Sequence, residues 1–336
     1  MKVLIIGMGS IGKRHMKNLL SAGVLHSDII AVDTREDRRN EVISFGVNDV
    51  YETIESALAN CEIDASIICS PTHLHMDHAI TLAKKGIHIM IEKPLSCNLD
   101  GITILKDEMK KNNIIVMMAY IFRFSPLTKK VKELLDTNMI GKILYCRGEF
   151  SEYLPDWHKY EDYRSFYMAE KSQGGGSILD QSHIFDLIHF LLGSFESVIA
   201  FNSKISSLEI NADDIAELIV KLKSGVIASI HTDIFGRDHK KYLEIKGENG
   251  NILWDFYSNK VILYQANDEL ETVFDDFEED FNLVYMDEIQ HFINLCNNND
   301  EVSISPLDDG IETMELILSA EKSHNLSKAQ KINQTN

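Results

Sequence analysis

The sequence predicts an α/β protein with two domains: a doubly wound parallel sheet at the N-terminus, then an α+β domain with an open, mainly antiparallel sheet. Three observations predict this. Short apolar runs alternate with helix-like segments over residues 2–124, a glycine-rich turn follows the first run, and consecutive strand-like segments fill residues 196–265. Apolar strands separated by helices are typical of a parallel sheet that is covered on both faces.

The first domain is expected to span residues 1–122. Its strands are expected at residues 2–6, 28–33, 64–70, 87–94 and 114–124. Helices are expected between them, with one at 73–86 that ends at Gly86 and one at 99–113.

The second domain is expected to span residues 123–336. A helix is predicted at 125–138, a strand at 141–150, and an apolar helix at 177–192 after three glycines. Six strands follow, and the turns KSG and GENG between them indicate antiparallel hairpins. Two further helices are predicted near 281–297 and 306–325.

The composition argues against several classes of function. The formal net charge of −19 disfavours nucleic acid or an anionic membrane as a partner, because both attract basic surfaces. No apolar run approaches the ~18 residues of a spanning helix, and the apolar N-terminus leads directly into the glycine turn, as a first strand would. The five cysteines form no CxxC pair, so we expect a cytoplasmic protein without a metal centre.

The motif GMGSIG lies between the first strand and the first helix, which is the context of a Rossmann dinucleotide site. Gly7 allows a tight turn, Gly9 lets a pyrophosphate approach the backbone, and Gly12 lets the helix pack on the strand. Ser10 and Ile11 belong to the same turn, whose N–H groups face the phosphates at the positive end of the helix. The motif therefore predicts a nicotinamide dinucleotide as cofactor.

Asp33 ends the second strand, where a carboxylate accepts hydrogen bonds from the adenosine ribose hydroxyls. The same negative charge repels a 2′-phosphate, so the sequence favours NAD over NADP. Arg35 is the opposing signal and a further cofactor candidate, because an arginine there can pair with a phosphate.

Five segments together resemble the Gfo/Idh/MocA family of oxidoreductases, in order along nearly the whole chain. They are GMGSIGKRH, SPTHLH at 70–75, EKPLSCN at 92–98, YIFRF at 120–124 and GGGSILDQSHIFDLIHFLLG at 174–193. The resemblance implies that Lys93 lies beside the nicotinamide and the substrate, and that Asp180 and His183 belong to the same site. It also implies that the SPTHLH loop lies against the cofactor. The further cofactor candidates are Ser70, Thr72, His75 and Glu92, and the role of Glu92 stays open.

One feature departs from the family pattern, because Asp180 and His183 are three positions apart where four is usual. Residues at i and i+3 share a helix face, so both are still expected to point to the same side of one helix. The DxSHxxD pattern and the aromatic segment upstream resemble a subgroup associated with bacterial nonulosonic and amino-sugar pathways.

These residue types suit reversible hydride transfer between nicotinamide C4 and a secondary alcohol or ketone of a sugar or nucleotide-sugar. Oxidising an alcohol requires a group that takes its hydroxyl proton, and a positioned acid/base contributes about 10²–10⁴-fold. Lys93 is one candidate, provided that its surroundings favour the free amine, and His183 is the other. Asp180 would orient Lys93 or bind a sugar hydroxyl.

Several features also have a simpler explanation. His73, His75 and His78 resemble a zinc motif only weakly, because no carboxylate or thiolate partner is evident. Arg123 is a substrate ligand or closes a helix C-terminus. An aromatic set in 151–173 suits either packing between the domains or stacking on a sugar ring. It comprises Tyr153, Trp157, Tyr160, Tyr163, Phe166 and Tyr167. The substrate candidates are therefore Arg123, Tyr153, Trp157 and Tyr163.

Two other functions stay open. Some members of the family use NAD as a bound catalyst for elimination and glycosidic cleavage, and net accumulation of NADH separates that activity from a simple dehydrogenase. The other is a non-catalytic NAD or sugar sensor, although Lys93, Asp180 and His183 weigh against it. The broad sheet expected in the second domain, together with the resemblance, indicates a homodimer or homotetramer.

Overall fold

The computed structural model describes residues 1–336 except 158–160, 266–270, 279, 299–300 and 333–336. The chain forms two compact units: unit 1 comprises residues 1–121 and 282–307, and unit 2 comprises residues 122–281 and 308–336. The sequence predicts that residues 123–336 form one domain. In the structure 282–307 belongs with unit 1, because its helix packs on the first helix of the chain. None of the described helices is long and apolar enough to cross a membrane.

Unit 1 contains a six-stranded sheet in the order β3-β2-β1-β4-β5-β6, in which every neighbouring pair is parallel. The strands are β1 (Val3–Ile6), β2 (Ile29–Val32), β3 (Asp49–Tyr51), β4 (Ala65–Ile68), β5 (His88–Glu92) and β6 (Val116–Ala119). The central strands are buried along their whole length, which confirms the predicted doubly wound sheet. Strand β3 was not predicted, because its three residues are only half-buried and form no apolar run.

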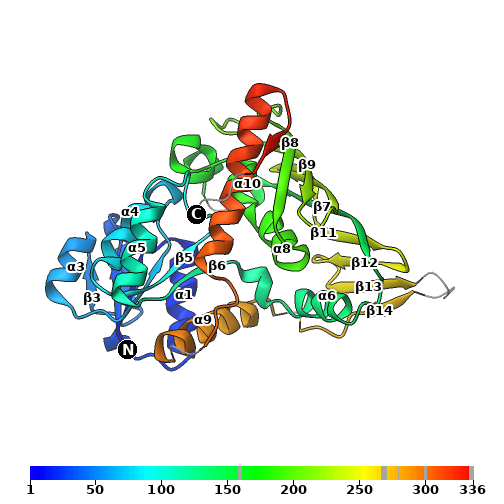
Figure 1. Cartoon of the computed structure of the whole chain (residues 1–336). Helices are drawn as coiled ribbons and strands as arrows, with labels where there is room; N and C mark the ends of the chain where they lie inside the picture. The colour runs from blue at the N-terminus through cyan, green and yellow to red at the C-terminus, as the bar shows by residue number, and fades with distance from the viewer. Residues whose placement is uncertain (158–160, 266–270, 279, 299–300, 333–336) are drawn as a thin grey trace. The chain divides into compact units, whose positions relative to one another are not determined.

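Helices cover this sheet, with α4 packed against α5 and α1 packed against α9 (Figure 1). They are α1 (Ser10–Ser21), α2 (Glu36–Ser44), α3 (Ile54–Asn60), α4 (His75–Ala83), α5 (Ile102–Asn112) and α9 (Asn282–Asn297). The side-chain amides of Asn18 in α1 and Asn282 in α9 exchange two hydrogen bonds, at 3.1 and 3.4 Å. This polar pair adds to the buried apolar residues of α9, among them Ile289, Phe292 and Leu295, in holding the C-terminal segment in unit 1.

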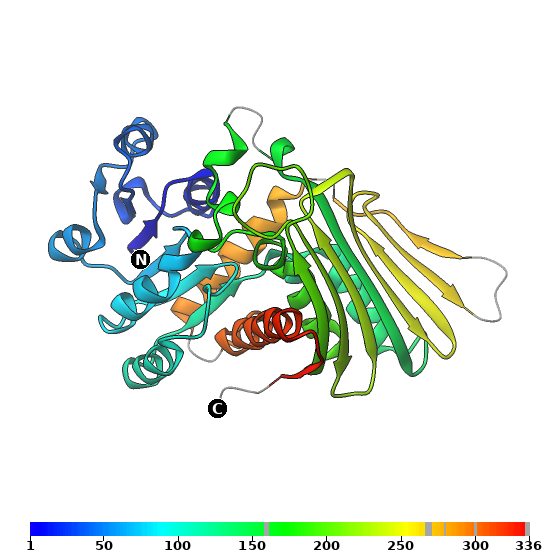
Figure 2. The same cartoon turned by 90° about the horizontal axis from the view of Figure 1, so that it is seen from above.

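Unit 2 contains a nine-stranded sheet in the order β14-β13-β12-β11-β7-β10-β9-β8-β15 (Figure 2). Its strands are β7 (Ile143–Tyr153), β8 (Phe195–Ser203), β9 (Ile215–Leu222), β10 (Ile227–Asp233), β11 (Phe235–Gly247), β12 (Gly250–Asp255), β13 (Lys260–Gln265), β14 (Thr272–Phe274) and β15 (Gln330–Lys331). Among the described pairs, β7 with β10 is parallel and the others are antiparallel. The predicted open, mainly antiparallel sheet is confirmed.

The helices of unit 2 are α6 (Pro126–Asp136), α7 (Ser177–Asp180), α8 (Ser182–Leu192) and α10 (Leu307–Leu326). They pack on one face of the sheet, with α6 on β12 and β13, α7 on β9 and β10, and α8 on β7. Along strand β9, buried residues alternate strictly with exposed or half-buried ones, as expected when helices cover one face of the sheet. The second face of this sheet therefore stays open.

Candidate functional site

The glycine turn of unit 1 is packed so closely that two of its glycines admit no side chain. Gly7 has φ +91°, and a Cβ on it would lie 2.6 Å from the backbone oxygen of Cys69. A Cβ on Gly12 would lie 1.9 Å from the oxygen of Gly7. Gly9 differs, because the nearest atom to its Cβ would be Nη1 of Arg38 at 3.7 Å. Of the three, only Gly9 could carry a Cβ without a clash, and it is the glycine at which a pyrophosphate approaches the backbone.

Helix α1 starts directly after this turn at Ser10, with Ile11 as its second residue. Gly9 provides no side-chain cap, and the first turn contains no acidic residue. The N–H groups at this end are therefore available to an anion. This arrangement fits the phosphates of a dinucleotide.

Asp33 follows β2 and is almost fully buried. One carboxylate oxygen accepts the N–H of Met8 in the glycine turn at 2.7 Å, and the other accepts the N–H of Arg35 at 2.8 Å. Asp33 thus ties the turn to the end of β2. The Arg35 guanidinium pairs with Asp37, whereas Arg38, which the sequence reading missed, lies 3.4 Å from the Asp33 carboxylate. Its position five residues after Asp33, in the first turn of α2, is the signal that could have identified it.

The Glu92–Lys93–Pro94 segment ends β5 at the carboxyl edge of the sheet, and its Lys93–Pro94 peptide is cis. Glu92 points inward: its Oε1 lies 2.7 Å from Nε2 of His15 in α1, and its Oε2 accepts the N–H of Lys93 at 3.2 Å. The expected cofactor contact of Glu92 therefore has a competing explanation, in which Glu92 shapes the turn that carries Lys93.

His75 connects the SPTHLH loop to this turn. One ring nitrogen lies 2.9 Å from the oxygen of Pro94 and the other 2.8 Å from the oxygen of Ser70. Burial lowers the pKa of His75. A neutral imidazole has one N–H, so His75 donates to one of these two carbonyls, and its ring lies between the two loops. Nearby, Ser70 Oγ bonds His78 at 3.0 Å and Thr72 is buried.

The described residues contain no group of three His, Cys, Asp or Glu that could hold a metal ion. The pKa of His78 is lowered to about 4, by burial first and then by neighbouring His75. A metal would bind neutral imidazole, but the partner ligands it needs are not gathered in the described part of the chain.

In unit 2, the segment 177–192 is two helices and not the single helix that the sequence predicted. Helix α7 ends at Asp180, Gln181 leaves helical geometry with ψ +21°, and α8 contains His183 in its first turn. Gly176, at φ +112°, precedes α7 because a Cβ there would lie 2.4 Å from the carboxylate of Asp213. That carboxylate accepts the Ile178 N–H at 2.9 Å and so caps α7. The i, i+3 argument for a shared helix face therefore does not apply.

Asp180 is buried and accepts a hydrogen bond from the Tyr167 hydroxyl at 3.4 Å. The His183 ring packs edge-on against Phe122, with 5.0 Å between the ring centroids. Both side chains thus contact aromatic neighbours of unit 2, Asp180 at the end of α7 and His183 in the first turn of α8.

Beside the break between α7 and α8 lies a charged group that the sequence reading missed. Gln181 donates to Glu152 at 3.3 Å, and Glu152 also forms an ion pair with Lys241 at 2.9 Å and accepts from the Tyr257 hydroxyl. The Lys241 ammonium lies within 5.6–6.0 Å of four aromatic rings, that of Phe122 among them. Sequence patterns gave no signal for this group, because its members come from β7, β11 and the turn after β12.

The aromatic substrate candidates are engaged in packing within unit 2. Trp157 and Tyr163 pack on a cluster formed by Leu154, Phe166, Leu208 and Ile234. Tyr153 lies under the guanidinium of Arg237, 3.5 Å from its ring centroid, and its hydroxyl accepts from Arg237 at 2.9 Å. Tyr160 lies outside the described residues. These contacts lie within unit 2 and are not the packing between domains that the sequence suggested, and stacking on a sugar ring stays a prediction.

Arg123, the fourth substrate candidate, is buried and ion-paired within unit 2. Its side chain is 1% exposed and forms a bidentate ion pair with Asp186 of α8 and a second pair with Asp309 of α10 at 2.6 Å. The guanidinium also lies 4.8 Å above the ring of Phe190. Burial raises the pKa of Asp186, while the adjacent guanidinium opposes that shift. Arg123 therefore joins two helices inside unit 2, and its substrate role stays a prediction with no contact of its own.

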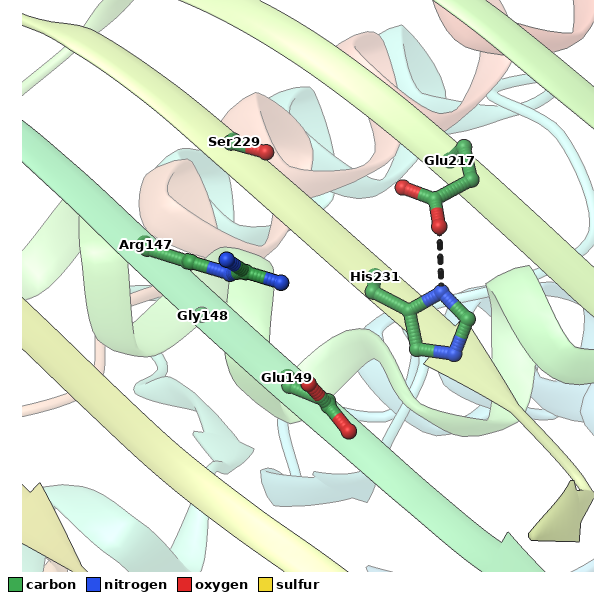
Figure 3. A pocket seen from close by; sticks show the side chains of 6 residues that line it. All are labelled: Arg147, Gly148, Glu149, Glu217, Ser229 and His231. Carbon is green, nitrogen blue, oxygen red and sulfur yellow. Dashed lines mark hydrogen bonds and ion pairs between the residues drawn. The ribbon is translucent and has the colours of Figure 1, made fainter.

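A pocket of about 280 Å³ lies on the open face of the unit 2 sheet. Figure 3 shows its lining residues, which are Arg147, Gly148, Glu149, Glu217, Ser229 and His231. His231 lies between two carboxylates, 2.6 Å from Glu217 and 2.7 Å from Asp233. The hydrogen bond to Asp233, together with Glu217, outweighs burial and raises the pKa of His231 to about 9. The imidazole is therefore a cation at neutral pH.

Known proteins resemble the whole chain. The family description "Oxidoreductase family, NAD-binding Rossmann fold" matches residues 1–120, and "Oxidoreductase family, C-terminal alpha/beta domain" matches residues 132–332. Among curated relatives, myo-inositol 2-dehydrogenase of Thermotoga maritima is 28% identical, covering 96% of each chain. scyllo-Inositol 2-dehydrogenase (NAD(+)) of Bacillus subtilis is 26% identical, covering 90% of this chain and 88% of its own.

Solved structures share the fold over the full length. A levoglucosan dehydrogenase in complex with NADH superposes with a TM-score of 0.87, covering 100% of both chains at 20% identity. The WlbA dehydrogenase from Bordetella pertussis, in complex with NADH and UDP-GlcNAcA, gives 0.84 over 99% of both chains at 18% identity. The two family matches, which together span nearly the whole sequence, confirm the resemblance and the predicted NAD-binding domain: the chain belongs to the Gfo/Idh/MocA family of oxidoreductases.

Proposed function

We propose that the protein is an NAD-dependent dehydrogenase that moves a hydride between nicotinamide C4 and a secondary alcohol or ketone of a sugar or cyclic polyol. The observation that carries this proposal is the position of Lys93, directly after β5 at the carboxyl edge of the parallel sheet. Ligands of open α/β sheets bind at that edge. The names of the relatives, which include inositol and levoglucosan dehydrogenases, support a ring with several hydroxyl groups as substrate.

Lys93 is the proposed acid/base for the substrate hydroxyl, with His183 as the alternative and Asp180 as an orienting or hydroxyl-binding group. The glycine turn and the start of α1 would hold the pyrophosphate of NAD. Asp33 would face the adenosine ribose, and its charge favours NAD over NADP. The nucleotide-sugar in the WlbA complex supports keeping nucleotide-sugars among the candidate substrates.

The test is formation of NADH with a panel of myo-inositol, scyllo-inositol, levoglucosan, free sugars and UDP-linked amino-sugar acids. The Lys93→Met variant should lose ~10²–10⁴-fold in turnover, which is the usual contribution of a positioned acid/base. Lys85→Met is the matched control, because Lys85 is exposed and precedes β5 at the opposite end of the strand. Normal turnover by Lys93→Met would contradict the assignment of Lys93 as the acid/base and leave His183 as the candidate. Glycosidic cleavage without net NADH would indicate the NAD-recycling activity instead.

We also propose that the open face of the unit 2 sheet binds a second copy of the chain. Ile199 and Ile219 are neighbours in adjacent strands and are 43% and 48% exposed, and Phe201 is 70% exposed. An exposed apolar row on a sheet face is typical of an association surface. The double variant Phe201→Lys/Ile219→Lys should be monomeric by analytical ultracentrifugation where the unaltered protein is a dimer or tetramer. An unaltered protein that sediments as a monomer contradicts this.

A further inference from the structure

The break between α7 and α8 in unit 2 separates two of the proposed site residues, Asp180 at the end of α7 and His183 in the first turn of α8. The residue at the break, Gln181, has ψ +21° and is 2% exposed. Its N–H donates to the oxygen of Ser177 at 3.0 Å, and its own oxygen accepts the N–H of Ile184 at 3.1 Å. A change of the backbone at Gln181 would therefore move Asp180 and His183 relative to each other.

Local backbone preferences do not hold this break in place. Helix α7 is a single turn of four residues, and a helix of this length is not stable by itself. Gln181 is neither a glycine nor a proline, the residues that usually mark an interruption of a helix. Contacts with the rest of unit 2 therefore stabilise the break. The side chain of Gln181 makes one of them, because its Nε2 donates to Oε2 of Glu152 at 3.3 Å.

Glu152 is a well-fixed acceptor for this hydrogen bond. It lies near the end of β7, its side chain is 13% exposed, and its Oε2 also forms the ion pair with Lys241 at 2.9 Å. The Tyr257 hydroxyl donates to its other oxygen. Burial alone would raise the pKa of Glu152, but its three donors together lower it, so the carboxylate is ionised at neutral pH. Because an ionised carboxylate only accepts hydrogen bonds, Gln181 turns its amide nitrogen toward Glu152.

The same ion pair also adjoins the ring on which His183 packs. The Lys241 ammonium lies 6.0 Å from the centroid of the Phe122 ring, at the outer limit of a cation–π contact. The His183 ring lies edge-on to Phe122, with 5.0 Å between the centroids. The Glu152–Lys241 pair is thus connected to both sides of the break, directly at Gln181 and through Phe122 at His183.

We propose that Glu152 is a positioning residue, whose hydrogen bond with Gln181 fixes the break and with it the placement of Asp180 and His183. This inference rests on the roles proposed above for Asp180 and His183. Strand β7 is a suitable anchor, because it is paired on both sides within the nine-stranded sheet, whereas α7 is a single turn. Site residues need such support, since a misplacement of about 1 Å can cost ~10²-fold in rate.

The test removes each partner of the hydrogen bond. Gln181→Met keeps the length of the side chain but cannot donate, and Glu152→Met removes the acceptor. Hydrogen exchange at the N–H groups of Gln181 and Ile184, read by mass spectrometry, reports on the break without any substrate. Each single variant should speed this exchange about tenfold, the effect of losing a hydrogen bond to a charged group. Gln290→Met is the matched control, because it makes the same substitution at an exposed glutamine of α9, and it should leave the exchange unchanged.

The double variant shows whether Glu152 acts through Gln181. If it does, Gln181→Met/Glu152→Met exchanges no faster than Glu152→Met alone, because the contact is already lost. A further tenfold increase in the double variant would mean that the two side chains act independently and would overturn the inference. Unchanged exchange in Gln181→Met or in Glu152→Met would overturn it as well.

The rate of NADH formation separates positioning from a purely structural role. Gln181→Met should lose about 10–100-fold in turnover. Its NADH affinity should equal that of the unaltered protein, because the glycine turn belongs to unit 1. Faster exchange at the break with unchanged turnover would mean that the contact only stabilises the fold, and the positioning role would then be wrong.

Circular dichroism verifies that each variant folds, and Gln181→Met alone decides the outcome if Glu152→Met does not fold. Exchange requires no turnover, so the inference and the proposed function fail separately. Absence of NADH formation with every member of the substrate panel would end the proposed function and leave the exchange result intact. An active unaltered protein, together with unchanged turnover in Gln181→Met, would end the inference alone.

Discussion

Replacing Arg123 by Met should destabilise unit 2 by about 4 kcal/mol, because it leaves Asp186 without its partner in the protein interior. The two side chains are 1% and 2% exposed, so water cannot replace the lost contact. Removing one member of a buried pair costs roughly 3–5 kcal/mol, and the second partner, Asp309, adds little because its side chain is 26% exposed. The double variant Arg123→Met/Asp186→Leu should recover most of the loss, since apolar replacements of a buried pair are roughly neutral.

Urea unfolding followed by tryptophan fluorescence is the assay, because both tryptophans, Trp157 and Trp254, belong to unit 2. Lys221→Met is the control: its surface pair with Glu196 has side chains 47% and 43% exposed, and its loss should cost less than about 1 kcal/mol. If Arg123→Met costs no more than this control, or if the double variant is as unstable as the single one, the structural role assigned to Arg123 is refuted.

Three more predictions follow from individual contacts. His231→Gln should lose about 3 kcal/mol of unfolding free energy below pH 6.5. The loss should vanish as the pH rises through about 9, because the raised pKa of His231 stabilises the fold only while the imidazole is protonated. Asp213→Asn should gain about 2 kcal/mol of unfolding free energy above pH 6 and nothing at pH 3.8, because burial raises the pKa of Asp213 to about 6 and the ionised carboxylate weakens the fold. Urea titrations at several pH values test the His231 and the Asp213 predictions. Gly12→Ala should lower both the melting temperature and NADH affinity, whereas Gly9→Ala should lower only NADH affinity, since a Cβ fits at Gly9 and not at Gly12. Thermal melts and NADH fluorescence titrations separate these two outcomes.

The elements that the sequence predicted best are those with strong periodic signals. Strands β1, β2, β4, β5 and β6 and the six strands β8–β13 form from apolar or alternating runs that are visible in the sequence. Strand β3 was missed because three half-buried residues form no such run. The break at Gln181 was missed because no glycine or proline marks it in the sequence.

The site residues divide in the same way. Lys93 and the glycines are positioned by local features, a strand end and a tight turn, which a motif specifies. The partners of Glu92 and Arg123 come from other helices, so residue type and spacing could not identify them. Arg123 was interpreted as a substrate ligand or as a residue that closes a helix, because it lies where the two expected domains meet. The fold buries it between two aspartates instead.

The measurement that tests the central claim most directly is the rate of NADH formation by Lys93→Met with the best substrate of the sugar and inositol panel. NADH binding to the variant is measured in parallel by fluorescence. We predict a loss in turnover of ~10²–10⁴-fold with NADH affinity close to that of the unaltered protein. Turnover equal to that of the Lys85→Met control would contradict the account, because hydride transfer would then proceed without the group that the structure places at the carboxyl edge of β5.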